Sequence, residues 1–78
     1  MRHEVAVPPM GETIGTGRIG RWYVREGERV GEDELLFEIV TDKADVQVPS
    51  PVAGTVREIR AGEGTTVEVG TIVAVIET

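Results

Sequence analysis

Short runs of valine, isoleucine and threonine, interrupted by glycine and proline, make up most of this chain. The 27 β-branched residues among 78 favour strands, because branched side chains pack well on a pleated surface. Alternation is clearest in DVQVP (45–49), where Val46 and Val48 share one face and Gln47 takes the other, and HEVAV (3–7) supplies a second such run. Ten glycines and four prolines separate the runs, as tight turns require. The pattern predicts an all-β fold.

One segment fits a helix as well as a strand, and an internal repeat decides between them. EDELLFEIVTDKA has acidic residues first and apolar residues at helical spacing. However, a shift of 37 residues places GRIGRWYVREGERVGEDELLFEIVT (17–41) on GTVREIRAGEGTTVEVGTIVAVIET (54–78) without a gap, with Gly27 on Gly64 and Ile39 on Ile76. LLFEIV then corresponds to the β-branched run IVAVIE. The strand interpretation is therefore favoured.

Each half of the repeat is too small to bury a core alone, so the two halves are expected to pack together. The predicted architecture is one domain, residues 1–78, built as a flattened barrel or sandwich of two small antiparallel sheets with quasi-twofold symmetry. The expected core consists of Trp22 with Val5, Val7, Ile19, Val30, Leu35, Ile39, Val56, Ile59, Val67, Ile72 and Ile76.

A single lysine stands between the strands predicted for LLFEIV and DVQV. Thr41, Asp42, Lys43 and Ala44 fill a turn-length gap there, so Lys43 is expected at the tip of a β-hairpin with its amine in solvent. The other seven basic residues are all arginines. A lysine at a hairpin tip is most often an ordinary solubilising residue, so position alone does not assign it a role.

Composition excludes several function classes. The chain has no cysteine and one histidine, His3, which argues against a thiolate or imidazole metal site. A net charge of −6 argues against nucleic acid as a partner, and no apolar run approaches the roughly 20 residues that cross a bilayer. Ser50, the only serine, lies between two prolines outside any nucleophile motif. We expect a cytoplasmic or matrix-like protein whose chemistry belongs to an attached group.

The ordered motifs resemble the lipoyl domain of 2-oxo acid dehydrogenase acyltransferases over nearly the whole chain. The run from VPPMGE through TDKA to SPVAG matches that family, with Gly27 sixteen residues before Lys43 and Gly54 eleven after it. The resemblance implies that lipoate is attached to Lys43 and that Asp42 and Ala44 flank it in the turn read by the decarboxylase. It also implies that a loop after the first strand helps to select the partner enzyme; its residues are Gly11, Glu12, Thr13 and Ile14.

The resemblance further implies a carrier without catalytic activity of its own. Its arm would serve a thiamine-dependent decarboxylase, an acyltransferase domain and a dihydrolipoamide dehydrogenase, after loading by a lipoate-attaching enzyme. We expect the isolated domain to be monomeric and to be the N-terminal piece of a longer acyltransferase. The 2-oxo acid stays open among pyruvate, 2-oxoglutarate and branched-chain acids.

One departure from the family pattern and two rival functions remain. The family has glutamate three residues before the lysine where this chain has Val40, and Glu38 lies two positions away on the same strand face. A biotin carboxyl carrier domain shares the architecture, but that family flanks its lysine with methionines, whereas Met1 and Met10 lie elsewhere. An unmodified structural barrel module is the third possibility.

Overall fold

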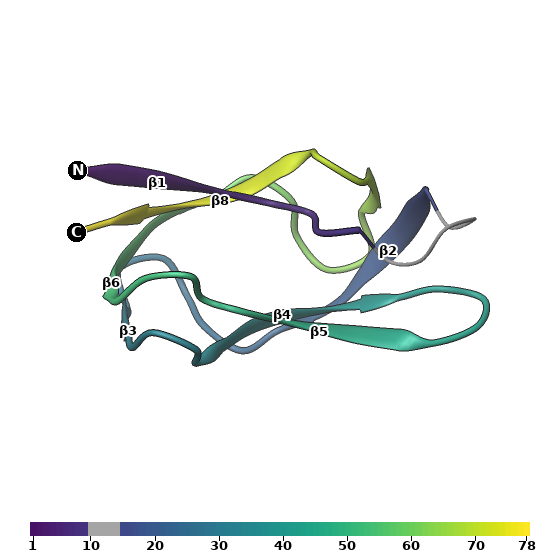
Figure 1. Ribbon diagram of the computed structural model, residues 1–78, viewed down its shortest axis with the longest axis horizontal. Coiled ribbons are helices and arrows are strands. Elements are labelled where there is room, and N and C mark those ends of the chain that lie inside the picture. Colours follow the sequence, from purple (N-terminus) through teal and green to yellow (C-terminus); the bar gives the residue numbers. More distant parts are fainter. Residues whose placement is uncertain (10–14) are drawn as a thin grey trace.

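The computed structural model describes residues 1–9 and 15–78 and contains two four-stranded antiparallel sheets in that part of the chain (Figure 1). One sheet has the order β1-β8-β6-β3 and the other the order β5-β4-β2-β7. The strands are β1 (Arg2–Ala6), β2 (Thr16–Trp22), β3 (Arg29–Val30), β4 (Leu35–Val40), β5 (Asp45–Pro49), β6 (Gly54–Ile59), β7 (Thr66–Glu68) and β8 (Ile72–Glu77). The predicted all-β sandwich is confirmed.

The sequence repeat is visible strand by strand. A shift of 37 residues carries β2, β3 and β4 onto β6, β7 and β8. The short strand of each half pairs with the other half, because β3 lies beside β6 and β7 lies beside β2. The two halves therefore exchange a strand, and neither half can complete its own sheet.

Two equivalent glycine turns hold the halves together. Gly27 and Gly64 have φ of 90° and 87°, a region that glycine enters without steric penalty. The Gly27 amide donates to the carbonyl of Val56 at 2.6 Å, and the Gly64 amide donates to the carbonyl of Ile19 at 2.7 Å. Because donors and acceptors are both related by the repeat, the quasi-twofold symmetry extends to single hydrogen bonds.

The acidic residue before each glycine completes this link. A Glu26 carboxylate oxygen accepts from the amide of Ile59 at 2.8 Å, and a Glu63 oxygen accepts from the amide of Trp22 at 3.2 Å. Both acceptor and donor are again mates in the repeat. The two E-G pairs thus satisfy strand-end amides that would otherwise lack a partner in the ladder.

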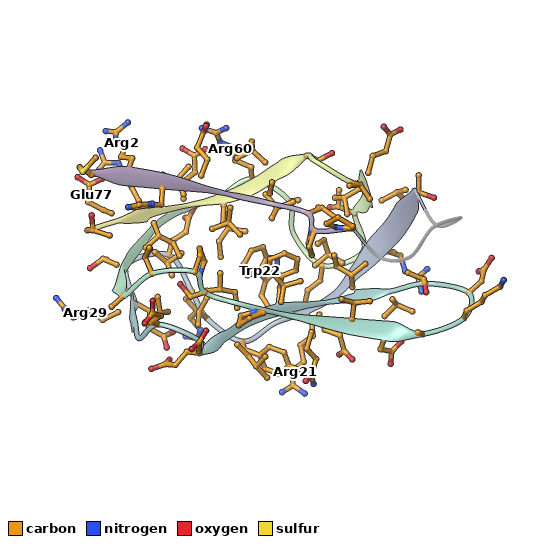
Figure 2. All side chains as sticks on the ribbon, viewed as in Figure 1. Arg2, Arg21, Trp22, Arg29, Arg60 and Glu77 are labelled. Carbon is orange, nitrogen blue, oxygen red and sulfur yellow. The ribbon has the colours of Figure 1, made fainter. Side chains whose placement is uncertain are left out.

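The core lies between the sheets and confirms most of the predicted positions. Trp22 and Ile59 pack against its edge, and eight further predicted residues are buried: Val5, Val7, Ile19, Val30, Ile39, Val56, Val67 and Ile76. The indole of Trp22 lies between the sheets, 4.7 Å from the ring of Phe37, and its Nε1 donates to the carbonyl of Ala61 at 2.7 Å (Figure 2). The indole N–H of Trp22, which is partly buried, therefore has a hydrogen-bond acceptor.

Leu35 was predicted in the core and this is wrong, because 38% of its surface is exposed. The pairing of β4 with β5 shifts between Leu35 and Phe37, so one extra residue enters β4 there. Such a bulge reverses the faces on one side of it, and Leu36 and Phe37 both turn inward. Ile72, the repeat mate of Leu35, is likewise only partly buried.

Candidate functional site

The β4–β5 hairpin carries the candidate site at one end of the molecule. The last ladder pair joins Val40 to Asp45, and the four residues between them form the loop. Figure 1 shows this loop at one end of the long axis and both chain ends at the other. Asp42, Lys43 and Ala44 are all exposed, so the structure brings together the three turn residues that the sequence predicted.

The side chain of Thr41 organises the turn. Its hydroxyl donates to the carbonyl of Ala44 at 2.6 Å and accepts from the amides of Ala44 and Lys43 at 3.1 and 3.4 Å. The Thr41 amide donates to the same Ala44 carbonyl at 3.0 Å. These bonds close the loop on itself and orient the Cα of Lys43. The sequence placed Thr41 in the turn but did not indicate this role.

The chain ends repeat the same arrangement at the opposite end. The Thr78 amide and hydroxyl both donate to the carbonyl of Met1, at 2.8 and 3.2 Å. Thr78 is the repeat mate of Thr41, so the end of β8 and the start of β1 occupy the place that the loop occupies between β4 and β5. At one end of the molecule the chain runs without a break from β4 through the loop to β5, whereas at the other end the equivalent strands, β8 and β1, are the two ends of the chain.

A groove of about 510 Å³ runs beside the hairpin. It is lined by Gly15, Thr16, Gly17, Arg18, Val40, Thr41, Asp42, Lys43 and Thr66. Arg18 faces Val40 across the β2–β4 ladder and Thr66 across the β2–β7 ladder. These residues fit a group joined to the Lys43 amine, because the amine is exposed at the tip and open space adjoins it. Apart from Asp42 and Lys43, the sequence indicated no functional role for the residues that line this groove.

Val40 occupies space that a glycine leaves free. A Cβ on Gly20 would lie 2.6 Å from a methyl carbon of Val40, so the valine covers the glycine backbone on the outer face of the sheet. Glu38 lies on the same face opposite Arg21, and one of its carboxylate oxygens is 3.5 Å from the Tyr23 hydroxyl. An acidic group is therefore present near the hairpin, but one ladder step farther from Lys43.

Other predicted features are placed as follows. Gly11, Glu12, Thr13 and Ile14 lie outside the residues that the structure describes. Ser50 is fully buried, and its hydroxyl donates to the carbonyl of Val52 at 2.6 Å, which gives it a structural role in the turn after β5. Within residues 1–9 and 15–78 there is no group of three His, Asp or Glu residues that could hold a metal ion, and no helix long enough to cross a membrane.

Comparison with known protein families identifies the family of this chain. Residues 3–76 match the biotin–lipoyl family model, described as "Biotin-requiring enzyme". The chain belongs to the biotin–lipoyl carrier family. Its membership covers almost every residue, including the hairpin with Lys43.

Curated relatives place the chain on the lipoyl side of this family. It is 47% identical over 77 residues to the dihydrolipoyllysine-residue succinyltransferase component of the 2-oxoglutarate dehydrogenase complex of Bartonella vinsonii subsp. berkhoffii, covering 99% of this chain and 19% of the relative. It is 45% identical over 76 residues to the corresponding acetyltransferase component of the pyruvate dehydrogenase complex of Corynebacterium glutamicum, covering 97% and 11%. The chain thus spans less than a fifth of the length of these relatives.

A solved structure agrees over the complete domain. The lipoyl domain of the 2-oxoglutarate dehydrogenase complex from Azotobacter vinelandii superimposes with a TM-score of 0.79 at 32% identity, covering 96% of this chain and 95% of that chain. The predicted lipoyl-domain fold is confirmed, and lipoate joined to a lysine is the cofactor of this class of carrier.

The Thr41 clamp of this lipoyl domain can be tested directly. We expect Thr41→Val to lower the initial rate of lipoylation about tenfold, because loss of the hydroxyl bonds, each worth about 1 kcal/mol, frees the loop to sample other shapes. Thr41→Ser keeps the hydroxyl and is the matched control. Initial rates followed by intact mass would contradict the clamp if the valine and serine variants are modified equally fast.

Proposed function

We propose that Lys43 is the lipoyl attachment residue and that this domain carries acyl groups and electrons within a 2-oxo acid dehydrogenase complex. One observation carries the proposal: the only lysine of a lipoyl-family chain stands exposed at the tip of a hairpin whose shape is held by Thr41. When bound, lipoate supplies a dithiolane, able to accept an acyl group and two electrons, at the end of a flexible arm.

Each residue of the hairpin has a different role in the proposed carrier. Thr41 orients the loop, Lys43 provides the amine for the amide bond, and Asp42 and Ala44 form the exposed surface on either side of it. Gly11, Glu12, Thr13 and Ile14 are proposed to help select the decarboxylase. The groove beside Lys43 leaves room for an attaching enzyme to reach the amine.

The proposed partners are a thiamine-dependent decarboxylase, the acyltransferase catalytic domain, dihydrolipoamide dehydrogenase and the lipoate-attaching enzyme. Tethering keeps the carried group near all of these sites at high effective concentration. The net charge of −6 favours basic entrances on the partners. By this proposal the isolated domain is a monomeric, cytoplasmic carrier that catalyses nothing itself, in keeping with the lack of an activated nucleophile or base among residues 1–9 and 15–78.

Intact mass tests the attachment directly. Incubation with a lipoate-attaching enzyme, lipoate and ATP should add about 188 Da, the mass of one lipoyl group in amide linkage. Lys43→Gln should add nothing, and peptide mapping should place the group on Lys43. Absence of any mass gain in the wild-type domain would contradict the proposal.

A second measurement would identify the 2-oxo acid that the complex uses. The relatives include components of a 2-oxoglutarate and a pyruvate dehydrogenase complex, so the proposal covers both of these acids, and branched-chain acids stay open beside them. Reductive acylation of the lipoylated domain by each candidate decarboxylase, with its own 2-oxo acid, should identify one strongly preferred enzyme. Acylation by none of them would contradict the carrier role.

A biotin carrier is the second candidate, because the matching family model includes biotin carriers. The residues around Lys43 favour lipoate, since Asp42 and Ala44 stand where biotin carriers have methionines. A biotin-attaching enzyme would add about 226 Da to a biotin carrier. Biotinylation faster than lipoylation would support this alternative instead.

A further inference from the structure

All basic side chains other than Lys43 are guanidinium groups, and all seven arginines are exposed. On a protein surface either lysine or arginine can provide a solvated positive charge, so exposure does not explain the choice. Among the described residues, an ion pair or aromatic stacking accounts for the choice of arginine at three positions. Arg2 lies 3.5 Å from Glu77, Arg60 pairs with Glu4 and Glu58, and Arg21 stacks 5.2 Å from the ring centroid of Tyr23.

At the remaining four positions the described contacts do not require a guanidinium. Within the part of the chain that the structure describes, no ion pair or aromatic stacking involves Arg18, Arg25, Arg29 or Arg57. A lysine at any of them would conserve the charge. The described ion pairs and stacking therefore do not explain the choice of arginine at these positions.

Arg18 is the arginine that shares the groove with Lys43. Arg18 lies on β2 and pairs with Val40 of β4. Val40 precedes Lys43 by three residues. A lipoyl-lysine arm contains about a dozen single bonds and reaches on the order of 15 Å. The groove is thus within the volume that the end of the arm can visit.

We infer that Arg18 keeps a positive charge beside the carrier arm in a form that cannot accept the acyl group. The inference rests on the proposed function, because it concerns the thioester that a lipoyl carrier presents. A guanidinium stays protonated at every physiological pH and has no free lone pair for attack. A lysine amine has a pKa of about 10.4 and releases a small nucleophilic fraction at neutral pH.

The side reaction that Arg18 avoids is an acyl transfer from sulfur to nitrogen. A neutral amine would attack the thioester carbonyl, the carbon–sulfur bond would break, and an amide and a free thiol would form. The amine loses one proton and the thiolate gains one, so no oxidant or reductant is needed. Because both groups belong to one molecule, high effective concentration compensates for the small free-amine fraction. The acyl group would be lost to residue 18, and the arm would be left as a free dithiol with nothing to deliver to the acyltransferase.

The terminal amine lies away from this region. The Met1 amine lies 3.1 Å from the carbonyl of Thr78, at the end of the domain opposite the hairpin (Figure 1). The domain is 33 Å long, about twice the extended arm. In the isolated domain, Met1 therefore serves as an internal reference for an amine beyond the reach of the arm.

Arg18→Lys tests the inference, with Arg29→Lys as the matched control. Arg29 lies on β3, is exposed, and occupies the end of the molecule away from the hairpin (Figure 2). Each variant conserves charge and introduces one amine. The lipoylated domains are reduced, loaded with acetyl by exchange with a small acetyl thioester, and freed of excess reagent. Loading in this way does not depend on any decarboxylase, so failure of the carrier proposal would be seen separately.

The readout is the mass that resists hydroxylamine. Neutral hydroxylamine cleaves thioesters but not amides. A domain that carries an acetyl group in amide linkage therefore stays about 42 Da heavier after the treatment. We expect the amide to form at least about tenfold faster in Arg18→Lys than in Arg29→Lys or the wild type, with the acetyl group mapped to residue 18. Lipoate-free Arg18→Lys treated with the same reagent should gain no such amide.

Two further outcomes complete the test. Arg18→Gln has no amine and should hold its thioester as long as the wild type, which separates the absence of an amine from the loss of charge. Equal amide formation in Arg18→Lys and Arg29→Lys, or none in either, would overturn the inference while leaving lipoylation of Lys43 and reductive acylation unaffected.

Discussion

Moving the hairpin lysine by one residue, with Asp42→Lys and Lys43→Ala together, is expected to lower lipoylation about 100-fold in a folded domain. One residue displaces the amine by roughly 3.3 Å and turns it toward another side of the loop. The Thr41 bonds hold the turn, so the loop cannot easily rearrange to restore the original position. An attaching enzyme must bring the amine in line with an activated carbonyl, and misplacement by about 1 Å already costs on the order of 100-fold.

The measurement compares the shifted variant with the wild type in the presence of ligase, lipoate and ATP, followed by intact mass. Unchanged thermal melting verifies that the variant is folded. The net charge differs by only one unit, because a carboxylate becomes an amine and an amine becomes a methyl group. Equal rates would show that the ligase selects any exposed amine in the loop rather than the position of Lys43.

Gly54→Ala is expected to destabilise the domain by about 2 kcal/mol, the typical effect of overpacking a filled core. Gly54 is buried between β3 and β8, and a Cβ there would meet the backbone carbonyl of Glu77 and lie 2.9 Å from a methyl carbon of Ile76. A backbone atom cannot move aside without disturbing the β6–β8 ladder. For a domain of this size the melting temperature should fall by about 10 °C.

Gly62→Ala is the matched control, because a Cβ at Gly62 would have nothing within 4 Å and its φ is not positive. This variant should melt within a few degrees of the wild type, since a change on the open surface typically alters stability by only about 0.5 kcal/mol. Thermal unfolding of both variants, followed by circular dichroism, checks the comparison. A Gly54→Ala domain that melts with the control would show that β6 and β8 can move apart there at little cost.

Most of the fold could be predicted because the repeat supplied information that local patterns lacked. LLFEIV alone fits a helix, and only its alignment with IVAVIE identified it as a strand. The face of Leu35 could not be predicted in this way. A bulge at Leu36 reverses the alternation, and a bulge depends on how many residues the partner strand offers at that point.

Some features of the candidate site could also be predicted from the sequence, and others needed the structure. Asp42, Lys43 and Ala44 could be placed in one exposed turn from sequence alone, because turn length and flanking strands are local properties. The hydroxyl bonds of Thr41 could be seen only in the closed loop, and the groove shared by Arg18 and Lys43 forms only because β2 lies beside β4. Gly11, Glu12, Thr13 and Ile14 stay predictions.

The sequence by itself determined the all-β class, the symmetry between halves and the lysine at the hairpin tip. Those properties follow from residue type, spacing and the 37-residue repeat, which act over short distances or by direct comparison of segments. The tertiary structure decided the exchange of β3 and β7, the cover that Val40 forms over Gly20, and the groove shared by Arg18 and Lys43. Each of these depends on which strands become neighbours, and that choice is made by burying one common core between two sheets.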